Sequence, residues 1–289
     1  MNAYFAPAKL NLFLHVVGRR ADGYHLLESV FQLLDFGDSL EISARADGVI
    51  RRANDVPGVP EADDLIVRAA HALKAATGAS QGAEIAVTKR IPMGGGLGGG
   101  SSDAASVLLA LNRLWDLRLA RAQLMAIGLK LGADVPFFLY GRNAFAAGIG
   151  EELTAVELPQ RWFVVLKPAV SVPTIEIFRA PDLTRDTKSV KIVDFPADGW
   201  SFPQNCFAND LQPVALGKYP AVARAVEWLQ GHDDRAEITA RMTGSGACVF
   251  SAFASESEAR RVYAERPAEL GGFVARSLAR HPLVDYAAD

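Results

Sequence analysis

The sequence predicts a mixed α/β fold divided between two domains. In the first half of the chain, short apolar runs that alternate like strands are interleaved with amphipathic stretches of helical period. Beyond Arg161 the same kind of pattern starts again, and half of the 289 residues are apolar, which is enough to bury a sizeable core. We therefore expect one domain over residues 1–160 and a second over residues 161–289, with the boundary near Gln160.

The spacing of apolar residues predicts the elements of the first half in order. Strands are expected at 9–17, 24–36, 39–44 and 83–88. Helices are expected at 63–76 and 121–131, and a further helix follows a glycine-rich loop. For that helix, Ser101, Ser102 and Asp103 supply the residue types that cap a helix N-terminus.

The second half has its own strands and helices. Strands are expected at 162–167, 237–243 and 247–253, and helices at 209–217, 221–231 and 256–266. Residues 181–203 are polar and punctuated by proline, and the part from 185 to 198 is a candidate for a mobile surface loop.

The charge balance and the cysteine count exclude several classes of protein. A net charge of −3 argues against a broad basic surface for nucleic acid, because phosphate neutralisation needs clustered Lys and Arg. Cys206 and Cys248 are too few and too far apart for a disulfide framework or a four-ligand zinc site. No apolar run approaches the ~18 residues that span a bilayer, and the N-terminus lacks a signal-peptide pattern. We expect a cytoplasmic protein with reduced thiols and with no membrane or nucleic-acid partner.

The glycine-rich loop is the most informative segment of the chain. Its residues are Pro92, Met93, Gly94, Gly95, Gly96, Leu97, Gly98, Gly99, Gly100, Ser101 and Ser102. Consecutive glycines can adopt positive φ and approach a bulky anion closely, and the N-terminus of the following helix adds unpaired N–H groups. The loop therefore predicts a phosphate site that needs no net basic charge, which suits ATP.

Three other interpretations of this loop fit its residues less well. A flexible linker is seldom bracketed by a strand and an apolar helix. A P-loop needs a Lys after its last glycine, and Ser101 and Ser102 stand there instead. A dinucleotide loop closes the first strand of its domain, whereas about 90 residues precede this one.

Two segments near the N-terminus carry side chains suited to a binding site. Lys9 and Asn11 are two apart on an apolar strand, so both point to the same face. The alternative for Lys9 is a strand-end side chain that reaches solvent. Tyr24 and His25 follow a turn and could stack on and hydrogen-bond to a flat base, although singly each is more often a packing residue.

Three further segments are candidates for the same site. Asp134 lies in an apolar stretch where an unpaired carboxylate is disfavoured, so it either pairs with a cation such as Lys9 or caps the next segment. Phe178 suits the wall of a base pocket and an apolar helix face almost equally. The turn Gly244-Ser245-Gly246 joins two predicted strands and by itself indicates only a hairpin.

Together these motifs show a resemblance to a known family. The run from Pro92 to Asp103, with the turn Gly244-Ser245-Gly246, resembles the GHMP kinases, named for galacto-, homoserine, mevalonate and phosphomevalonate kinase. The resemblance implies an α+β two-domain GHMP kinase fold, with an N-terminal domain like domain 2 of ribosomal protein S5 and a ferredoxin-like C-terminal α/β domain. It also implies ATP as co-substrate with Mg²⁺ held mainly by phosphate and water, so no protein metal site is expected, although Ser101 or Ser102 could touch the ion.

The N-terminal segments narrow the resemblance to one branch. Pro-Ala-Lys-Leu-Asn-Leu from Pro7 and Gly-Arg-Arg-Ala-Asp-Gly-Tyr-His from Gly18 are similar to the kinases that phosphorylate the 2-hydroxyl of a cytidine-diphosphate-linked methylerythritol in non-mevalonate isoprenoid synthesis. The branch implies that Lys9 and Asp134 serve phosphoryl transfer and that the glycine-rich loop binds ATP. It implies substrate contacts from Asn11, Tyr24, His25, Phe178, Gly244, Ser245 and Gly246.

Some questions stay open at the level of sequence. Residues 181–204 match nothing in the family pattern, and the adenine pocket has only candidate edges in Lys89, Arg90 and residues 55–64. A GHMP kinase with another acceptor, a non-catalytic metabolite sensor and a dehydrogenase are the alternatives in decreasing order. We expect a monomer or a weak homodimer.

Overall fold

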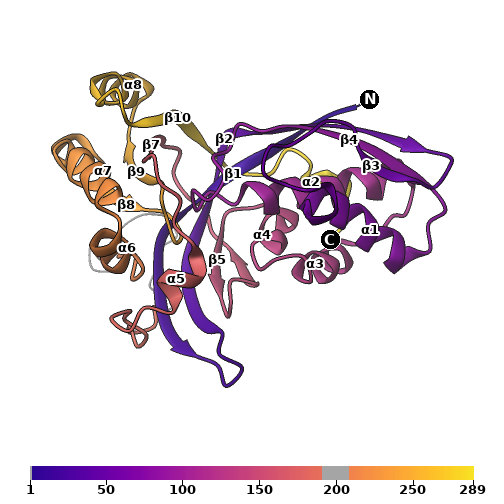
Figure 1. Ribbon diagram of the computed structural model, residues 1–289, viewed down its shortest axis with the longest axis horizontal. Coiled ribbons are helices and arrows are strands. Elements are labelled where there is room, and N and C mark those ends of the chain that lie inside the picture. Colours follow the sequence, from indigo (N-terminus) through magenta and orange to yellow (C-terminus); the bar gives the residue numbers. More distant parts are fainter. Residues whose placement is uncertain (1, 191–207) are drawn as a thin grey trace.

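The computed structural model describes residues 2–190 and 208–289. Two long strands, β1 (Asn2–Arg19) and β2 (His25–Arg45), form an antiparallel hairpin through the middle of the molecule (Figure 1). β2 is one strand where the sequence predicted two. The pairing continues through Gly37, opposite Pro7, because a glycine there lets β1 approach: a Cβ on Gly37 would lie 2.2 Å from the carbonyl oxygen of Ala6.

The other strands extend this hairpin into one sheet. They are β3 (Ile50–Arg52), β4 (Gly82–Thr88), β5 (Ala144–Ala147), β6 (Glu152–Ala155), β7 (Trp162–Lys167), β8 (Ile238–Met242), β9 (Val249–Phe253) and β10 (Gly271–Leu278). Their order is β3-β4-β2-β10-β7-β9-β8, and β1 and β5 also pair with β2. β10 pairs antiparallel with β7 along most of its length and with β2 at its end, so it joins the two halves of the chain.

The helices lie in two groups. They are α1 (Leu65–Thr77), α2 (Gly99–Leu114), α3 (Arg121–Leu129), α4 (Val135–Tyr140), α5 (Thr174–Phe178), α6 (Gln212–Lys218), α7 (Pro220–Gln230) and α8 (Glu256–Glu265). Figure 1 shows α1 to α4 together below β2 and β4, and α6 to α8 at the opposite end beside β7 to β9. None of the described helices is long and apolar enough to cross a membrane.

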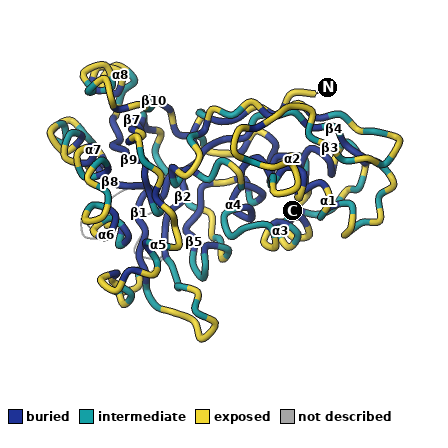
Figure 2. Tube along the Cα trace, viewed as in Figure 1, coloured by how far each residue is buried: buried dark blue, intermediate teal, exposed yellow. Residues whose placement is uncertain are grey.

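Buried apolar side chains form a cluster in each group and a third between them. The first packs α1, α2 and α4 against β2 and β4, and the second packs α6 and α7 against β8 and β9. In the third, Leu10 and Phe13 of β1 meet Phe163 of β7 and Phe250 of β9. Figure 2 shows this central region as buried. The third cluster fixes β1 against the C-terminal half, which matters because β1 carries part of the site.

The last residues of the chain return to the N-terminal half. Leu283 and Ala287 belong to the first cluster, and the buried guanidinium of Arg121 donates to the carbonyl oxygens of Leu139, Val284 and Ala287 at 2.8–2.9 Å. Figure 1 places the C-terminus beside α1 and α3. Arg121 therefore holds α3, α4 and the C-terminal segment together.

Most of the predicted elements are confirmed with small shifts at their ends, except that β1 begins at Asn2 and not at Lys9. The helices expected at 63–76 and 256–266 are α1 and α8, and the strands expected at 83–88 and 162–167 are β4 and β7. Sequence patterning did not predict β3, α4, β5, β6, α5 or β10. Cys248 is a buried free thiol, as expected, whereas Cys206 and the predicted loop from residue 191 onward lie outside the described residues.

The predicted cap of α2 is wrong. The helix begins at Gly99, with Gly98 at the N-cap position at φ +72°, and no side chain caps it. Ser101, Ser102 and Asp103 lie inside the first turns of the helix instead. Gly98 can enter the helix from a left-handed conformation that a residue with a Cβ resists, so the helix starts earlier and its first N–H groups stay uncapped.

Candidate active site

A cavity of about 990 Å³ opens between β1, β2, α5 and the glycine-rich loop. The predicted site residues that line it are Lys9, Asn11, Tyr24, His25, Gly94, Gly96, Gly98, Ser101, Asp134, Phe178, Gly244, Ser245 and Gly246. A neighbouring cavity of about 310 Å³ is lined by Lys89, Ile91 and the loop from Pro92 to Ser101. The structure thus brings together motifs that are more than 200 residues apart in the sequence.

Lys9 and Asp134 form an ion pair at the cavity wall. The Nζ of Lys9 lies 3.6 Å from the Oδ2 of Asp134, 5.0 Å from the centre of the Phe31 ring, and donates to the Oδ1 of Asn11. Lys9 is only 3% exposed, so it does not reach solvent, while the Asp134 side chain is 35% exposed. Asp134 occupies the N-cap position of α4 but its carboxylate makes no capping hydrogen bond. The carboxylate therefore faces the cation and the cavity.

Lys9 is the buried member of this ion pair. Burial lowers the pKa of the Lys9 ammonium, and the nearby Asp134 carboxylate partly offsets this effect. The sequence placed the buried charge on Asp134, because that residue stands in an apolar stretch. The structure shows instead that the apolar residues after Asp134 turn inward in α4, while the carboxylate stays at the cavity.

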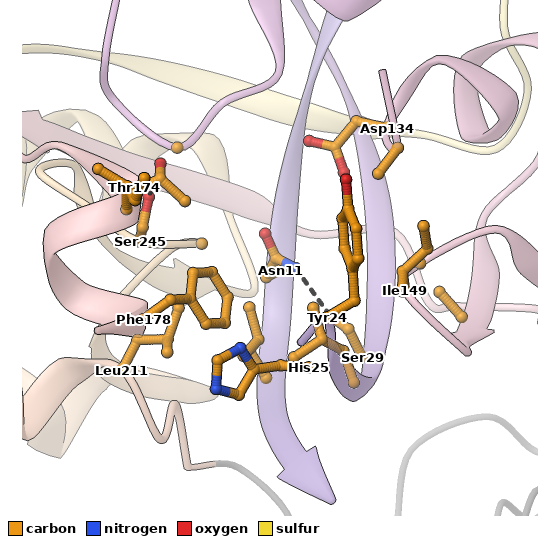
Figure 3. Close-up of a pocket in the computed structure, with 18 of the residues that line it drawn as sticks. Asn11, Tyr24, His25, Ser29, Asp134, Ile149, Thr174, Phe178, Leu211 and Ser245 are labelled. Carbon is orange, nitrogen blue, oxygen red and sulfur yellow. Dashed lines mark hydrogen bonds between the residues drawn. The ribbon is translucent and has the colours of Figure 1, made fainter. Parts of the chain in front are cut away.

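Asn11 connects this pair to the third motif. Its Nδ2 donates to the Oγ of Ser29 at 2.9 Å (Figure 3), and its backbone N–H donates to the Oγ1 of Thr243 at 2.9 Å. Ser29 in turn donates to the carbonyl oxygen of Phe13 at 2.5 Å. All of these residues are buried. The network fixes the amide of Asn11 so that its oxygen faces Lys9.

The glycine-rich loop is held in place by its carbonyl groups. The N–H groups of Lys9, Ala247 and Cys248 donate to the carbonyl oxygens of Leu97, Gly94 and Gly95 at 3.0, 3.3 and 3.2 Å. The three alternate glycines Gly94, Gly96 and Gly98 have φ values of +66°, +75° and +72°. Because its carbonyls are engaged with β1 and the turn before β9, the loop can present its N–H groups on the other side.

Those N–H groups are unpaired. Among the described residues, no hydrogen bond is donated by the backbone N–H groups of residues 94–101, and the first to donate is Ser102, to the carbonyl oxygen of Gly98 at 2.9 Å. A run of free N–H groups at the N-terminus of a helix attracts anions, because the helix dipole adds positive potential there. The arrangement is that of a phosphate cradle built without basic side chains.

Ser101 and Ser102 differ in their positions. Ser101 lines both cavities, whereas Ser102 is fully buried and lines neither, and its Oγ has no hydrogen-bond partner. Among the described residues, no group of three or more His, Cys, Asp or Glu side chains could hold a metal ion. The oxygens of Ser101 and Asp134 are donors that Mg²⁺ accepts, so they fit an ion that keeps its waters and binds mainly to phosphate.

A buried charge cluster that sequence patterning missed lies behind the loop. The Nζ of Lys89 lies 2.6 Å from the Oδ2 of Asp103 and also contacts Asp38. Asp38 accepts hydrogen bonds from the N–H groups of Arg90 and Ile91 as well. Burial raises the pKa of Asp103 to about 7, against the opposing effect of Lys89. The cluster ties β2, the end of β4 and α2 together at the base of the loop.

Aromatic side chains line the other end of the main cavity. Phe178 lies at the end of α5 beside His25, with ring centres 5.0 Å apart and planes inclined by 33°, and Figure 3 shows Tyr24 across from them. Tyr24 is 61% exposed and lines the cavity. Phe178 packs on the second apolar cluster and also lines the cavity.

The turn between β8 and β9 faces the cavity opposite Asp134. The hydroxyl groups of Ser245 and Thr174 lie 2.7 Å apart (Figure 3), and the carbonyl oxygen of Gly244 accepts a hydrogen bond from Asn209 at 2.8 Å. The sequence singled out Ser245 but not Thr174, which stands at the start of a five-residue helix that has no strong sequence signal.

Comparisons with known proteins place the chain in a family. The chain matches the family model for the GHMP kinases N terminal domain over residues 64–142 and that for GHMP kinases C terminal over residues 202–271. A protein of Cupriavidus necator named 4-diphosphocytidyl-2-C-methyl-D-erythritol kinase is 59% identical, over 98% of this chain and 94% of its own length. A Burkholderia mallei protein of the same name is 56% identical, over 98% and 96%.

A solved structure shows that the similarity extends to the fold. A crystal structure of 4-(cytidine 5'-diphospho)-2C-methyl-D-erythritol kinase is similar to this chain with a TM-score of 0.78 and 33% identity, covering 96% of this chain and 99% of its own. The similarity therefore extends through both halves of the chain and includes the three motifs at the cavity. The chain belongs to the 4-diphosphocytidyl-2-C-methyl-D-erythritol kinase family, within the GHMP kinases, and is an ATP-dependent small-molecule kinase with the α+β GHMP kinase fold.

Proposed function

We propose that this chain transfers the γ-phosphoryl group of ATP to the 2-hydroxyl of 4-(cytidine 5'-diphospho)-2-C-methyl-D-erythritol, a step of non-mevalonate isoprenoid synthesis. The relatives that match nearly the whole chain carry the name of this activity. The observation that carries the mechanism is the Lys9–Asp134 ion pair, at 3.6 Å, in a cavity that also contains unpaired loop N–H groups and an aromatic end.

In the proposed reaction, Asp134 accepts the proton of the 2-hydroxyl as the oxygen attacks the γ-phosphorus. Lys9 holds the carboxylate in position and offsets negative charge on the transferred group. A loose phosphoryl transition state spreads charge over its oxygens, so positioned charges and donors do most of the catalytic work. The ammonium group of Lys9 is held in position, because it donates a hydrogen bond to Asn11 and packs beside the ring of Phe31.

The glycine-rich loop is proposed to bind the phosphates of ATP. The unpaired N–H groups of residues 94–101 supply the donors, and Ser101 is the side chain of the loop that reaches the cavity. Mg²⁺ would offset the charge of the β- and γ-phosphates, with Ser101 and Asp134 as the oxygen donors nearest to it and water for the rest. Ser102 offers neither its N–H group nor its hydroxyl to the cavity, so we assign it no contact.

The substrate is proposed to lie with its cytosine between Tyr24 and Phe178, beside His25. The turn Gly244-Ser245-Gly246 then faces the region between the base and Asp134, where the diphosphate has to pass. We further propose a cytoplasmic enzyme that is a monomer or a weak homodimer, with its two domains meeting near Gln160. The two isolated cysteines, which are too few for a disulfide framework, support the cytoplasmic location.

The test is ADP release with Mg-ATP and the cytidyl substrate, beside mevalonate, galactose and homoserine. Of these four alcohols, we expect only the cytidyl substrate to be phosphorylated. The rate should fall by about 100-fold or more in Asp134→Ala. Asp285→Ala is the control, because Asp285 is an exposed carboxylate that lines neither cavity. Turnover with another alcohol would overturn the acceptor, and full activity of Asp134→Ala would overturn the assigned base. ATP binding without turnover would indicate a sensor.

A further inference from the structure

We propose that Arg185 is a positioning residue that fixes His25 in the tautomer with its proton on Nδ1, so that the base pocket presents a donor and favours cytosine over uracil. The inference rests on the proposed function, in which His25 lies beside the base. Arg185 was not singled out by any sequence motif, and it lines the same cavity as His25.

The contact between the two side chains defines the tautomer. The Nε of Arg185 donates to the Nε2 of His25 at 3.2 Å. A guanidinium has only donors, so the imidazole nitrogen that it faces must be an acceptor. In a neutral imidazole the other nitrogen then carries the proton, which places N–H on Nδ1. Among the described residues, no hydrogen bond involves that Nδ1.

Arg185 is itself held in one orientation. Its two terminal nitrogens donate to the carbonyl oxygens of Leu183 at 3.0 Å, Ala180 at 2.6 Å and Phe178 at 3.2 Å. Three carbonyl groups of one short segment therefore fix the guanidinium plane, and the remaining Nε–H has to point toward His25. Through the Phe178 carbonyl the same guanidinium also ties down the residue whose ring lies beside the imidazole.

The charge of Arg185 favours the neutral imidazole. Burial lowers the pKa of His25, and the positive charges of Arg185 and Arg19 lower it further. Protonated His25 would place an N–H group against the N–H group of Arg185, which the short contact forbids. The ring therefore offers one donor, on Nδ1, to whatever occupies the cavity.

A fixed donor discriminates between the two pyrimidines. N3 of cytosine is a hydrogen-bond acceptor, whereas N3 of uracil carries a proton, so uracil would set a donor against a donor. Leaving such a pair unsatisfied in a partly buried site reduces binding by about tenfold to a hundredfold. A histidine free to exchange tautomers could accept from uracil and would lose this discrimination. Arg185 thus supplies selectivity without touching the base.

The first experiment compares kcat and KM for the cytidyl substrate and its uridyl analogue in wild type, Arg185→Met and the control Arg224→Met. Arg224 is an exposed arginine of α7 in the same half of the chain. We expect Arg185→Met to lower the cytidyl-to-uridyl ratio of kcat/KM about tenfold or more, mainly through KM, and Arg224→Met to leave it unchanged. An unchanged ratio in Arg185→Met would overturn the proposal.

A double variant separates positioning from direct contact. On a His25→Gln background, Arg185→Met should change the ratio no further, because Arg185 acts through His25. An additional loss of the same size as in the wild-type background would show that Arg185 contacts the substrate itself, which contradicts the proposal.

The tautomer can be read without turnover and without an Arg185 variant. In wild-type protein labelled with ¹⁵N-histidine, the His25 signals are identified by their loss in His25→Gln. They should show a protonated Nδ1 and an unprotonated Nε2 at neutral pH. The opposite pattern, or averaged signals, would refute the inference even if the kinase activity is as proposed. Failure of wild type to phosphorylate the cytidyl substrate would instead refute the proposed function.

Discussion

Among the glycines of the loop, Gly96 is the one at which an added methyl group would make the shortest contact. Its φ is +75°, and a Cβ there would lie 2.2 Å from the carbonyl oxygen of Thr243, where real contacts do not fall below about 3.0 Å. Thr243 cannot retreat easily, because its hydroxyl accepts the N–H of Asn11 and it is fully buried. In Gly96→Ala the loop therefore has to move away from the turn before β9.

The size of the effect follows from these two terms. A left-handed conformation costs an alanine about 1–2 kcal/mol, and overpacking a tight contact costs about 1–3 kcal/mol more. We expect Gly96→Ala to lower the free energy of unfolding by about 2–5 kcal/mol if the loop stays in place. If the loop moves instead, the cost in stability is smaller, but its N–H groups no longer converge and KM for ATP rises by about tenfold or more.

A second glycine serves as a control that carries the backbone cost without the steric contact. Gly78 ends α1 with φ +70°, and a Cβ there would meet nothing within 4 Å. Gly78→Ala should therefore show only the backbone cost, and KM for ATP should not change. The assays are urea unfolding and coupled ADP release at varied ATP concentration. Equal losses of stability in the two variants, with an unchanged KM for ATP in Gly96→Ala, would refute the close approach of the loop to Thr243.

Three further predictions concern buried titratable groups. Lys9→Met should lower kcat about 100-fold or more. It should lower the free energy of unfolding by no more than about 1–3 kcal/mol, because the Oδ1 of Asn11 loses its buried donor while the cost of burying the ammonium is removed; a larger loss in urea unfolding would contradict this. In wild type, kcat should fall as the pH rises and Lys9 loses its proton. This fall should occur at a lower pH than the pKa of an ordinary lysine, because burial lowers the pKa of Lys9. Burial lowers the pKa of His281 from 6.5 to about 3. As the pH falls, the unfolded chain therefore binds a proton at His281 before the folded chain does. The free energy of unfolding is highest above pH 6.5 and decreases as the pH falls toward 3. Near pH 4.5 this loss is about 3 kcal/mol, and it should be absent from the pH dependence of urea unfolding in His281→Asn, which keeps an acceptor for the N–H of Leu283.

The parts of the site that the sequence predicted are those with a local cause. Lys9 and Asn11 share a face because strand side chains alternate, and the loop needs glycines because of its backbone conformation. Both causes act over a few residues, so a pattern reveals them. The association of Lys9 with Asp134 needed more, namely the argument that a charge among apolar residues requires a partner. That argument found the pair but assigned the burial to the wrong member.

The parts that the sequence did not predict depend on residues that meet only in the fold. The sequence offered Lys89 only as a candidate edge of the adenine pocket, because Asp38 and Asp103, which contact its ammonium, come from two other elements. Arg185 stands in a proline-punctuated stretch without periodicity, and its contact with His25 spans 160 residues. The start of α2 was misjudged for a different reason: serine is the better cap in general, but here uncapped N–H groups are what an anion site requires.

The three motifs meet because β1 has two edges and uses them differently. Residues two apart on a strand point their N–H groups to the same edge, and one edge of β1 is paired with β2 throughout the site. The other edge offers the N–H groups of Lys9 and Asn11, and these hold the carbonyl oxygen of Leu97 in the loop and the hydroxyl of Thr243 before the turn. The side chains of the same two residues, perpendicular to that edge, hold each other and Asp134. One short segment of a strand therefore sets the positions of the glycine-rich loop, the Asp134 carboxylate and the turn at once, and a shift of register in β1 would separate all three.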